Sequence, residues 1–477
     1  MNQETAAALA ATVDMTIGGA GVAAPGTFGV VNPSTGEVFA NAPRADKAVL
    51  DTALSDNAQA FESWRQDDAA RRSYLDKAAD AVAAATDDIA ALISAEQGKV
   101  LTTAKHEVRT AVAWLRYYAS LELPREIVQD NARGFSEVVR DPLGVVAAIT
   151  PWNFPISLAM WKIAPALRAG NTVLLKPSPY TPLSSLRLGQ ALRDVLPPGV
   201  LNVVTGLDEL GPWLTAHPAP RKISFTGSIE TGKRVAAAAA ADLKRVTLEL
   251  GGNDPAIVLD DADVDAIADE LFWGAFTNSG QICLAIKRVY APRNRYQEVV
   301  DALVARAEQA VVGDPFDPAS TIGPVSNRPQ LDLVSELVSE AVEGGAVAAS
   351  GGRRLDSNGF FYAPTILRDV SDGARIVDIE QFGPALPVVP YTDVDEVVGR
   401  INAGHYGLTA TVWGSDADRA EEIARRLEYG TVSVNTHSGG IGPHLPFGGH
   451  KWSGLGVENG PWGLHGFTDL KLVHRKK

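Results

Sequence analysis

The stretch Val145-Val-Ala-Ala-Ile149 is a short apolar run, and it leads directly into the turn Thr150-Pro-Trp-Asn-Phe-Pro155. Further apolar runs follow along the chain, each separated from the next by a helical pattern. The runs are 145–149, 172–175, 201–204, 223–225 and 246–250, and the helical stretches between them are 156–169, 183–195, 207–216 and 230–241. Continuous apolar strands that alternate with helices are typical of a parallel sheet covered on both faces. We therefore predict an α/β fold.

Unusual polar, glycine and proline residues follow these strands directly. The segments are 150–155, 176–179, 226–228 and 251–253. Ligands of a parallel sheet bind beyond the carboxyl ends of its strands. The sequence therefore predicts a binding site at this edge of the sheet.

Residues 227–233 read Gly-Ser-Ile-Glu-Thr-Gly-Lys, which fits the first part of a P-loop. A P-loop needs Ser or Thr next to hold Mg²⁺, whereas the next residue here is Arg234. A nucleotide hydrolase is therefore disfavoured. A glycine turn that leads into a helix can still bind phosphate through free backbone N–H groups, so the turn fits a dinucleotide pyrophosphate without a metal.

The chain contains a single cysteine, Cys283, in the segment Gly-Gln-Ile-Cys, and a carboxylate, Glu249, in the segment Glu-Leu-Gly-Gly-Asn. A lone thiol forms no internal disulfide and makes no thiolate metal site, so no metal is expected. It is either a buried small residue or a nucleophile. A thiol together with a carboxylate that activates it or its water would make a thiol enzyme. Both interpretations stay open on this feature alone.

Charge and hydropathy exclude several classes of protein. The chain has 477 residues, enough for more than one domain, and a formal net charge of −14. An acidic chain without runs of Lys and Arg is not expected to bind nucleic acid. The N-terminus lacks a basic segment followed by an apolar core, and no apolar stretch reaches the ~18 residues that span a membrane. We expect a cytoplasmic protein that does not associate with a membrane.

A second α/β region is predicted from about 252 to 445. Its predicted helices are 264–277, 295–311, 328–343 and 416–428, and its strands are 409–413 and 431–434. Two other segments, near 133–141 and at 466–474, read as separate strands. Edge strands expose unpaired backbone groups, so each needs a partner in the same subunit or another.

A set of motifs in this order resembles the NAD(P)-dependent aldehyde dehydrogenase family over nearly the whole chain. The motifs are Pro151-Trp-Asn-Phe-Pro155, Lys176-Pro-Ser178, Phe225-Thr-Gly-Ser228, Glu249-Leu-Gly-Gly252, Gly280-Gln-Ile-Cys283, Glu380-Gln-Phe-Gly-Pro384 and Pro446-Phe-Gly-Gly449. The resemblance implies a Rossmann-like parallel-sheet domain that binds the dinucleotide, a second α/β catalytic domain, and a small β element for oligomerisation. On this basis we assign residues 1–122 and 143–251 to the dinucleotide-binding domain and residues 252–445 to the catalytic domain. Residues 123–142 and 464–477 are assigned to the oligomerisation element. A homodimer or homotetramer is expected.

The resemblance also implies the catalytic residues. Cys283 would attack the aldehyde carbon as a thiolate. Asn153 and the backbone N–H of Cys283 would stabilise the oxyanion. Once hydride has left for the nicotinamide, Glu249 would draw a proton from the water that hydrolyses the thioester.

The cofactor implied is NAD or NADP. The residues that the resemblance assigns to it are Trp152, Lys176, Ser178, Pro179, Gly227, Ser228, Leu250, Glu380 and Phe382. Lys176 would contact the adenosine ribose, Gly227 and Ser228 the pyrophosphate, and Glu380 the nicotinamide ribose. The family commonly has a glutamate where this chain has Pro179. We therefore expect both cofactors to be accepted, with a slight preference for NAD⁺.

The substrate is expected to be an apolar or aromatic aldehyde. The residues that would line its pocket are Phe154, Leu158, Trp161, Ile282, Leu284 and Phe447, and none could pair with a substrate carboxylate. His437 and His444 either face the pocket mouth or lie in a solvated loop. The alternatives are a coenzyme A-acylating enzyme, which Glu249 disfavours, a charged-semialdehyde dehydrogenase, and a catalytically retired binding scaffold.

Overall fold

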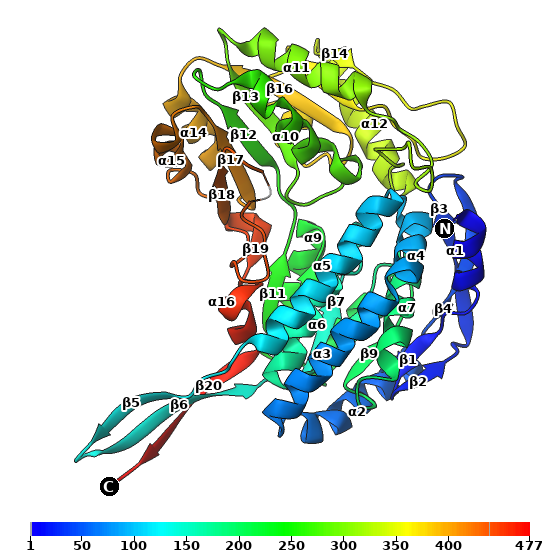
Figure 1. Cartoon of the computed structure of the whole chain (residues 1–477), viewed down its shortest axis with the longest axis vertical. Coiled ribbons are helices and arrows are strands. Elements are labelled where there is room, and N and C mark those ends of the chain that lie inside the picture. Colours follow the sequence, from blue (N-terminus) through cyan, green and yellow to red (C-terminus); the bar gives the residue numbers. More distant parts are fainter. Residues whose placement is uncertain (1, 438) are drawn as a thin grey trace.

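The computed structural model describes residues 2–437 and 439–477 and confirms an α/β fold with two large sheets (Figure 1). The first is an eight-stranded sheet in the order β19-β11-β10-β7-β8-β9-β1-β2. Its bounds are β1 (Met15–Ile17), β2 (Ala20–Val22), β7 (Val145–Ile149), β8 (Thr172–Lys176), β9 (Leu201–Val203), β10 (Pro220–Thr226), β11 (Arg245–Glu249) and β19 (Gly454–Leu455). The strands from β11 to β9 in this order are parallel, as the apolar runs predicted.

The helices between these strands bury both faces of the sheet. Every residue of β7 and β8 is buried, which is why these strands are apolar throughout. Helix α6 is buried along its whole length, and α5 and α3 pack outside it (Figure 1). The bounds are α2 (Lys47–Trp64), α3 (Asp68–Ala84), α4 (Thr86–Gln97), α5 (Leu101–Ser120), α6 (Ser157–Ala169), α7 (Leu183–Arg193), α8 (Leu210–Ala216) and α9 (Ile229–Ala240).

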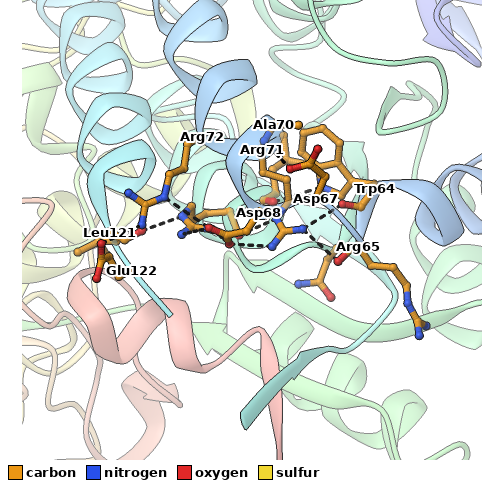
Figure 2. Close-up of polar contacts among 12 residues, drawn as sticks. Trp64, Arg65, Asp67, Asp68, Ala70, Arg71, Arg72, Leu121 and Glu122 are labelled. Carbon is orange, nitrogen blue, oxygen red and sulfur yellow. Dashed lines mark hydrogen bonds and ion pairs between the residues drawn. The ribbon is translucent and has the colours of Figure 1, made fainter. Parts of the chain in front are cut away.

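A cluster of charged side chains around Asp68 holds the C-terminal end of α6 (Figure 2). Asp68 pairs with Arg168 of α6 at 2.5 Å and with Arg71 at 2.9 Å. Arg168 has no exposed side-chain surface and also donates to the carbonyl of Leu121, beyond the end of α5, at 2.8 Å. Burial opposes ionisation of Asp68, but Arg168 and its neighbours outweigh burial and hold the pKa of this carboxyl below its usual value. The cluster therefore ties α3, α5 and α6 together.

The second sheet has seven strands in the order β14-β15-β16-β13-β12-β17-β18. Its strands are β12 (Asp254–Val258), β13 (Ile286–Pro292), β14 (Val347–Ser350), β15 (Thr365–Arg368), β16 (Ala385–Tyr391), β17 (Thr409–Trp413) and β18 (Thr431–Val434). All but β14 are parallel to their neighbours. The prediction found β17 and β18 but not the central strands. The helices are α10 (Val264–Phe276), α11 (Tyr296–Gln309), α12 (Arg328–Glu343), α13 (Arg375–Asp378), α14 (Val394–Ala403) and α15 (Ala417–Ala424).

A three-stranded antiparallel sheet, β20-β6-β5, projects from the body as an arm (Figure 1). Its strands are β5 (Glu126–Asn131), β6 (Gly134–Pro142) and β20 (Thr468–Arg475). The two segments predicted as separate strands pair with each other inside one chain, with Thr468 opposite Pro142. The remaining elements are α1 (Gln3–Ala10), β3 (Gly26–Asn32), β4 (Glu37–Arg44), η1 (Thr277–Gly280), η2 (Lys451–Ser453) and α16 (Gly460–His465). None of the helices in the described residues is long and apolar enough to cross a bilayer.

Candidate active site

Cys283 lies in a tight turn between α10 and β13. The chain enters this turn through consecutive left-handed residues, Asn278 (φ 53°), Ser279 (φ 59°) and Gly280 (φ 72°). A Cβ on Gly280 would lie 2.4 Å from the carbonyl oxygen of Gly383, so only glycine fits there. The residues 281–287, called here the nucleophile turn, are held by the buried side chain of Gln281, whose Oε1 accepts from the N–H of Ser326 at 2.8 Å.

Asn153 joins the turn after β7 to the nucleophile turn. Its Nδ2 donates to the carbonyl of Gln281 at 2.9 Å. An amide nitrogen carries two protons, so this bond leaves one donor beside Cys283. The backbone carbonyl of Asn153 accepts from Nζ of Lys99 at 2.7 Å, and Lys99 is itself buried and paired with Glu107. The amide is therefore fixed from both sides before any substrate arrives.

Glu249 is the last residue of β11 and is only 3 % exposed. Neither carboxylate oxygen has a hydrogen-bond partner among the residues that the structure describes. Burial raises the pKa of Glu249 well above its ordinary value, the charge of Glu458 raises it further, and Lys162 opposes the rise. A carboxyl group with a raised pKa can take up a proton near neutral pH, as a general base must.

A buried ion pair that the sequence analysis missed lies behind Glu249. Nζ of Lys162 on α6 contacts Oε1 of Glu458 and Oγ1 of Thr226, both at 2.7 Å. Both members of the pair are almost completely buried. The sequence could have indicated Lys162, because it lies inside α6, a helix of mostly apolar residues that are all buried. A lysine buried in such a helix must have a partner.

A cavity of about 260 Å³ opens beside these residues, between the carboxyl ends of the first sheet and the nucleophile turn. It brings together most of the residues predicted for catalysis and for the cofactor. Its predicted lining residues are Trp152, Asn153, Gly227, Ser228, Leu250, Cys283, Glu380 and Phe382. Gln330 and Leu333 of α12 also line it, and the sequence analysis did not name them.

Glu380 and Phe382 form the wall opposite the first sheet. Oε1 of Glu380 accepts from the N–H of Gly252 at 3.2 Å, and burial raises the pKa of Glu380 to about 7 although Lys287 opposes it. A Cβ on Gly251 would lie 2.2 Å from this carboxylate, so a side chain there would displace the carboxylate of Glu380. The ring of Phe382 meets that of Trp152 edge to face at 5.3 Å.

Lys176, Ser178 and Pro179 lie outside that cavity. Burial lowers the pKa of the Lys176 ammonium to about 8, while Asp208 and Glu209 oppose the shift. Pro179 lines a second cavity of about 470 Å³, together with Asp208 and Glu209. The predicted cofactor residues therefore line two separate cavities or lie beside them.

Five of the six predicted pocket residues belong to or pack against the apolar core of the first sheet region, and none of the six lines the cavity of about 260 Å³. Leu158, Trp161 and Phe447 are buried, and Phe154 and Leu284 pack against the same core as Cys283. Trp161 stacks on Trp114 at 5.5 Å and meets Phe447 edge to face at 5.2 Å. Ile282 is half-buried and is not part of that core.

His437 is buried rather than solvated, and burial lowers its pKa to about 4. His444 is exposed, as a residue of a solvated loop would be.

Residues 22–473 match the aldehyde dehydrogenase family. The chain belongs to this family. It is 41 % identical to a probable succinate-semialdehyde dehydrogenase [NADP(+)] of Sinorhizobium fredii (94 % of this chain, 92 % of the relative). It is 40 % identical to a geranial dehydrogenase of Castellaniella defragrans (93 % and 94 %). A betaine aldehyde dehydrogenase of Staphylococcus aureus, solved in complex with NAD⁺, superposes with a TM-score of 0.96 at 31 % identity (99 % and 97 %).

These matches extend over nearly the full length of the chain and of its relatives. The protein is therefore an NAD(P)-dependent aldehyde dehydrogenase, an oxidoreductase with the fold of that family. Cys283 and Asn153 line the cavity of about 260 Å³, whereas Glu249, the residue before Leu250, does not.

Proposed function

We propose that the enzyme oxidises an apolar or aromatic aldehyde to the carboxylic acid through a covalent intermediate on Cys283. The observation that carries this proposal is Glu249, a buried carboxylate without a hydrogen-bond partner in the described chain, at the strand end beside the thiol cavity. A group of that kind is costly to bury and serves no packing role. It is suited to activating the water that releases a covalently bound acyl group.

The proposed reaction has two stages. Sγ of Cys283 bonds to the aldehyde carbon, and the carbonyl oxygen becomes an oxyanion that accepts from the free Nδ2 proton of Asn153 and the N–H of Cys283. Loss of hydride from that carbon restores the carbonyl and leaves a thioester. Glu249 then takes a proton from water, the hydroxide oxygen bonds to the carbonyl carbon, and the C–S bond breaks to release the acid and the Cys283 thiolate.

The dinucleotide supplies the hydride acceptor when it is bound. The cavity fits such a group, because Ser228 caps α9 and leaves helix N–H groups near Gly227, where a pyrophosphate is stabilised. A Cβ on Gly227 would lie 2.5 Å from the ring of Phe225, so this position carries no side chain and the backbone of the turn stays open to a ligand. Glu380 would accept from ribose hydroxyls and Phe382 would support the ring. We assign residues 1–122 and 143–251 to the dinucleotide domain and 252–445 to the catalytic domain.

Both cofactors should serve, with a narrow preference for NAD⁺. Pro179 offers a ribose neither a side-chain acceptor nor an N–H, so NAD⁺ loses an anchor there. Asp208 and Glu209 place negative charge near Lys176, which disfavours a 2′-phosphate, although Glu209 is paired with Arg44 at 2.6 Å. We expect the two values of kcat/KM to differ by less than about a hundredfold, roughly 2.7 kcal/mol.

The test is a panel of aldehydes with each cofactor, followed as NAD(P)H absorbance with and without coenzyme A. We expect kcat/KM for hexanal or benzaldehyde to exceed that for succinic semialdehyde by at least about tenfold, because the predicted pocket residues hold no cation for a carboxylate. A reversed order would overturn the substrate class. An acyl-coenzyme A product would mean an acylating enzyme, and no absorbance with any aldehyde would mean a retired scaffold.

We also propose that the arm β20-β6-β5, residues 123–142 and 464–477, joins subunits into a homodimer or homotetramer. Ile127 and Val128 on β5 and Leu470 and Leu472 on β20 are all more than half exposed. Exposed apolar residues on a projecting sheet are unfavourable in water and mark an interface.

Light scattering should give a mass of at least two chains for the intact protein. Deletion of 466–477 should yield a monomer or an aggregate, because it removes β20 and unpairs β6. Deletion of 476–477 alone, beyond the end of β20, is the matched control and should leave the mass per particle unchanged. A monomeric mass for the intact protein would rule the interface out.

A further inference from the structure

Lys287 lies four positions after Cys283. It is the second residue of β13, and its side chain is 1 % exposed. Nζ donates to the carbonyls of Ile282 at 2.6 Å, Ala285 at 3.2 Å and Cys283 at 3.3 Å. A single ammonium therefore holds three carbonyls of the nucleophile turn.

The charge of this ammonium is not cancelled by a hydrogen-bonded carboxylate. Within the described parts of the chain, the carboxylate oxygen nearest to Nζ is Oε1 of Glu380, at 3.9 Å. Lys162, by contrast, hydrogen-bonds its carboxylate at 2.7 Å. A buried charge bound only to neutral carbonyls acts more strongly on its surroundings than a neutralised pair does.

The groups around Cys283 are otherwise unfavourable for a thiolate. Burial raises the pKa of the Cys283 thiol to about 12, and the negative charges of Glu380, Asp254 and Glu249 add to the rise. Lys287 is the cation that opposes it. The other titratable group near Lys287 is His437, which burial keeps neutral at pH 7. A nucleophilic thiolate in this setting needs a nearby positive charge.

We propose that Lys287 is a positioning residue of the reaction, which holds the nucleophile turn in place and supplies the positive charge that favours the Cys283 thiolate. This inference rests on the proposed role of Cys283 as nucleophile. Nζ of Lys287 also lies 5.6 Å from the ring centre of Phe382 and 3.9 Å from Oε1 of Glu380. The same ammonium therefore lies near two residues that line the cavity opposite the first sheet.

The test uses the fact that Cys283 is the only thiol of the chain. The rate of alkylation by iodoacetamide, followed by intact mass, reports the thiolate of Cys283 without any turnover. In Lys287→Met the pH profile of alkylation should move upward by about one to two pH units, since the variant removes the cation that favours the thiolate. Lys287→Gln, which can still donate to the carbonyls, should show a similar shift because it lacks the charge.

Asp254→Asn provides an independent arm if the lysine variants fold poorly. Burial raises the pKa of Asp254 to about 7, so above that pH it is ionised and opposes the thiolate. Its amide variant should therefore move the alkylation profile to lower pH. Lys244→Met is the matched control. It removes a buried lysine that pairs with Asp242 in the loop between α9 and β11, and it should leave the alkylation profile of Cys283 unchanged.

The outcomes separate this proposal from the proposed function. If Lys287→Met or Lys287→Gln alkylates with the wild-type profile, Lys287 does not favour the thiolate. If Asp254→Asn moves the profile upward, the charges around Cys283 do not set its thiolate fraction, and the proposed charge effect of Lys287 falls with them. If the shifts occur but Cys283→Ala still oxidises aldehydes, the electrostatic inference stands and the role of Cys283 falls. In a competent Lys287→Met enzyme, kcat/KM should recover as pH rises, which a purely structural defect would not produce.

Discussion

Replacement of Cys283 by alanine should lower NAD(P)H formation from every aldehyde by at least about 10⁴-fold, the scale on which removal of a nucleophile acts. The reason is that hydride loss requires a tetrahedral carbon bonded to sulfur, and the chain contains no other thiol. The measurement is the initial rate with a good substrate and saturating cofactor.

The same variant should keep its thermal unfolding midpoint and its affinity for the dinucleotide. Cys283 is half-buried, and its thiol makes no hydrogen bond to the described residues, so its loss should cost little stability. A residual rate above about one hundredth of wild type would contradict the assignment, because such a rate exceeds what orientation alone supplies after the nucleophile is gone.

Replacement of Glu249 by glutamine should separate the two stages. The first stage needs only the thiol and the oxyanion donors, so up to one equivalent of NAD(P)H per site should form in a burst. The steady-state rate should then fall by about 10²–10⁴-fold, because the amide cannot take a proton from water. Stopped-flow absorbance measures the burst, and intact mass should detect the acyl group on Cys283.

An exposed carboxylate provides the matched control. Glu122 lies beyond the end of α5 with 77 % of its side chain exposed, and Glu122→Gln should behave as wild type. If Glu249→Gln turned over at the wild-type rate, the base would have to be another carboxylate, and Glu458 would be the next to test.

In the wild-type enzyme the steady-state rate should rise with pH through a pKa well above that of an ordinary glutamate, since Glu249 is active only when ionised.

The sequence identified the five parallel strands of the first sheet, β7 to β11, but not β1, β2 or β19, and it identified the strands of the second sheet only in part. β7 is predicted correctly because its residues are all apolar and all buried. β12 begins with Asp254, and β13 carries Lys287 and Arg288, so neither reads as an apolar run. β16 contains two prolines, which argue against a strand by local rules. Asp254 and Arg288 are buried because Thr409 and the carbonyl of Asn253 bond to them from distant positions. Lys287 is buried because it donates to carbonyls two to five positions earlier. No pattern of apolar residues reveals either kind of partner.

The proposed catalytic residues could be named in advance because each lies in a short contiguous motif. Cys283, Glu249 and Asn153 each follow or lie in a turn whose glycines and prolines are visible in the sequence. The residues that orient them could not be named. Lys162 pairs with Glu458 across 296 positions, and Lys99 reaches the carbonyl of Asn153 across 54.

The sequence by itself determined the α/β class, the parallel order of apolar runs and helices, and the turns that follow the strands, because these depend on hydropathy and backbone preference within a few residues. Only the tertiary structure decided the strand order, the pairing of β20 with β6 inside one chain, and the surroundings of the thiol. The physical reason is that burial and charge act through space. Glu249 and Lys287 are ordinary charged residues in the sequence. Glu249 acquires a raised pKa, and Lys287 acts strongly on nearby charges, only where the fold removes water and brings other groups close to them.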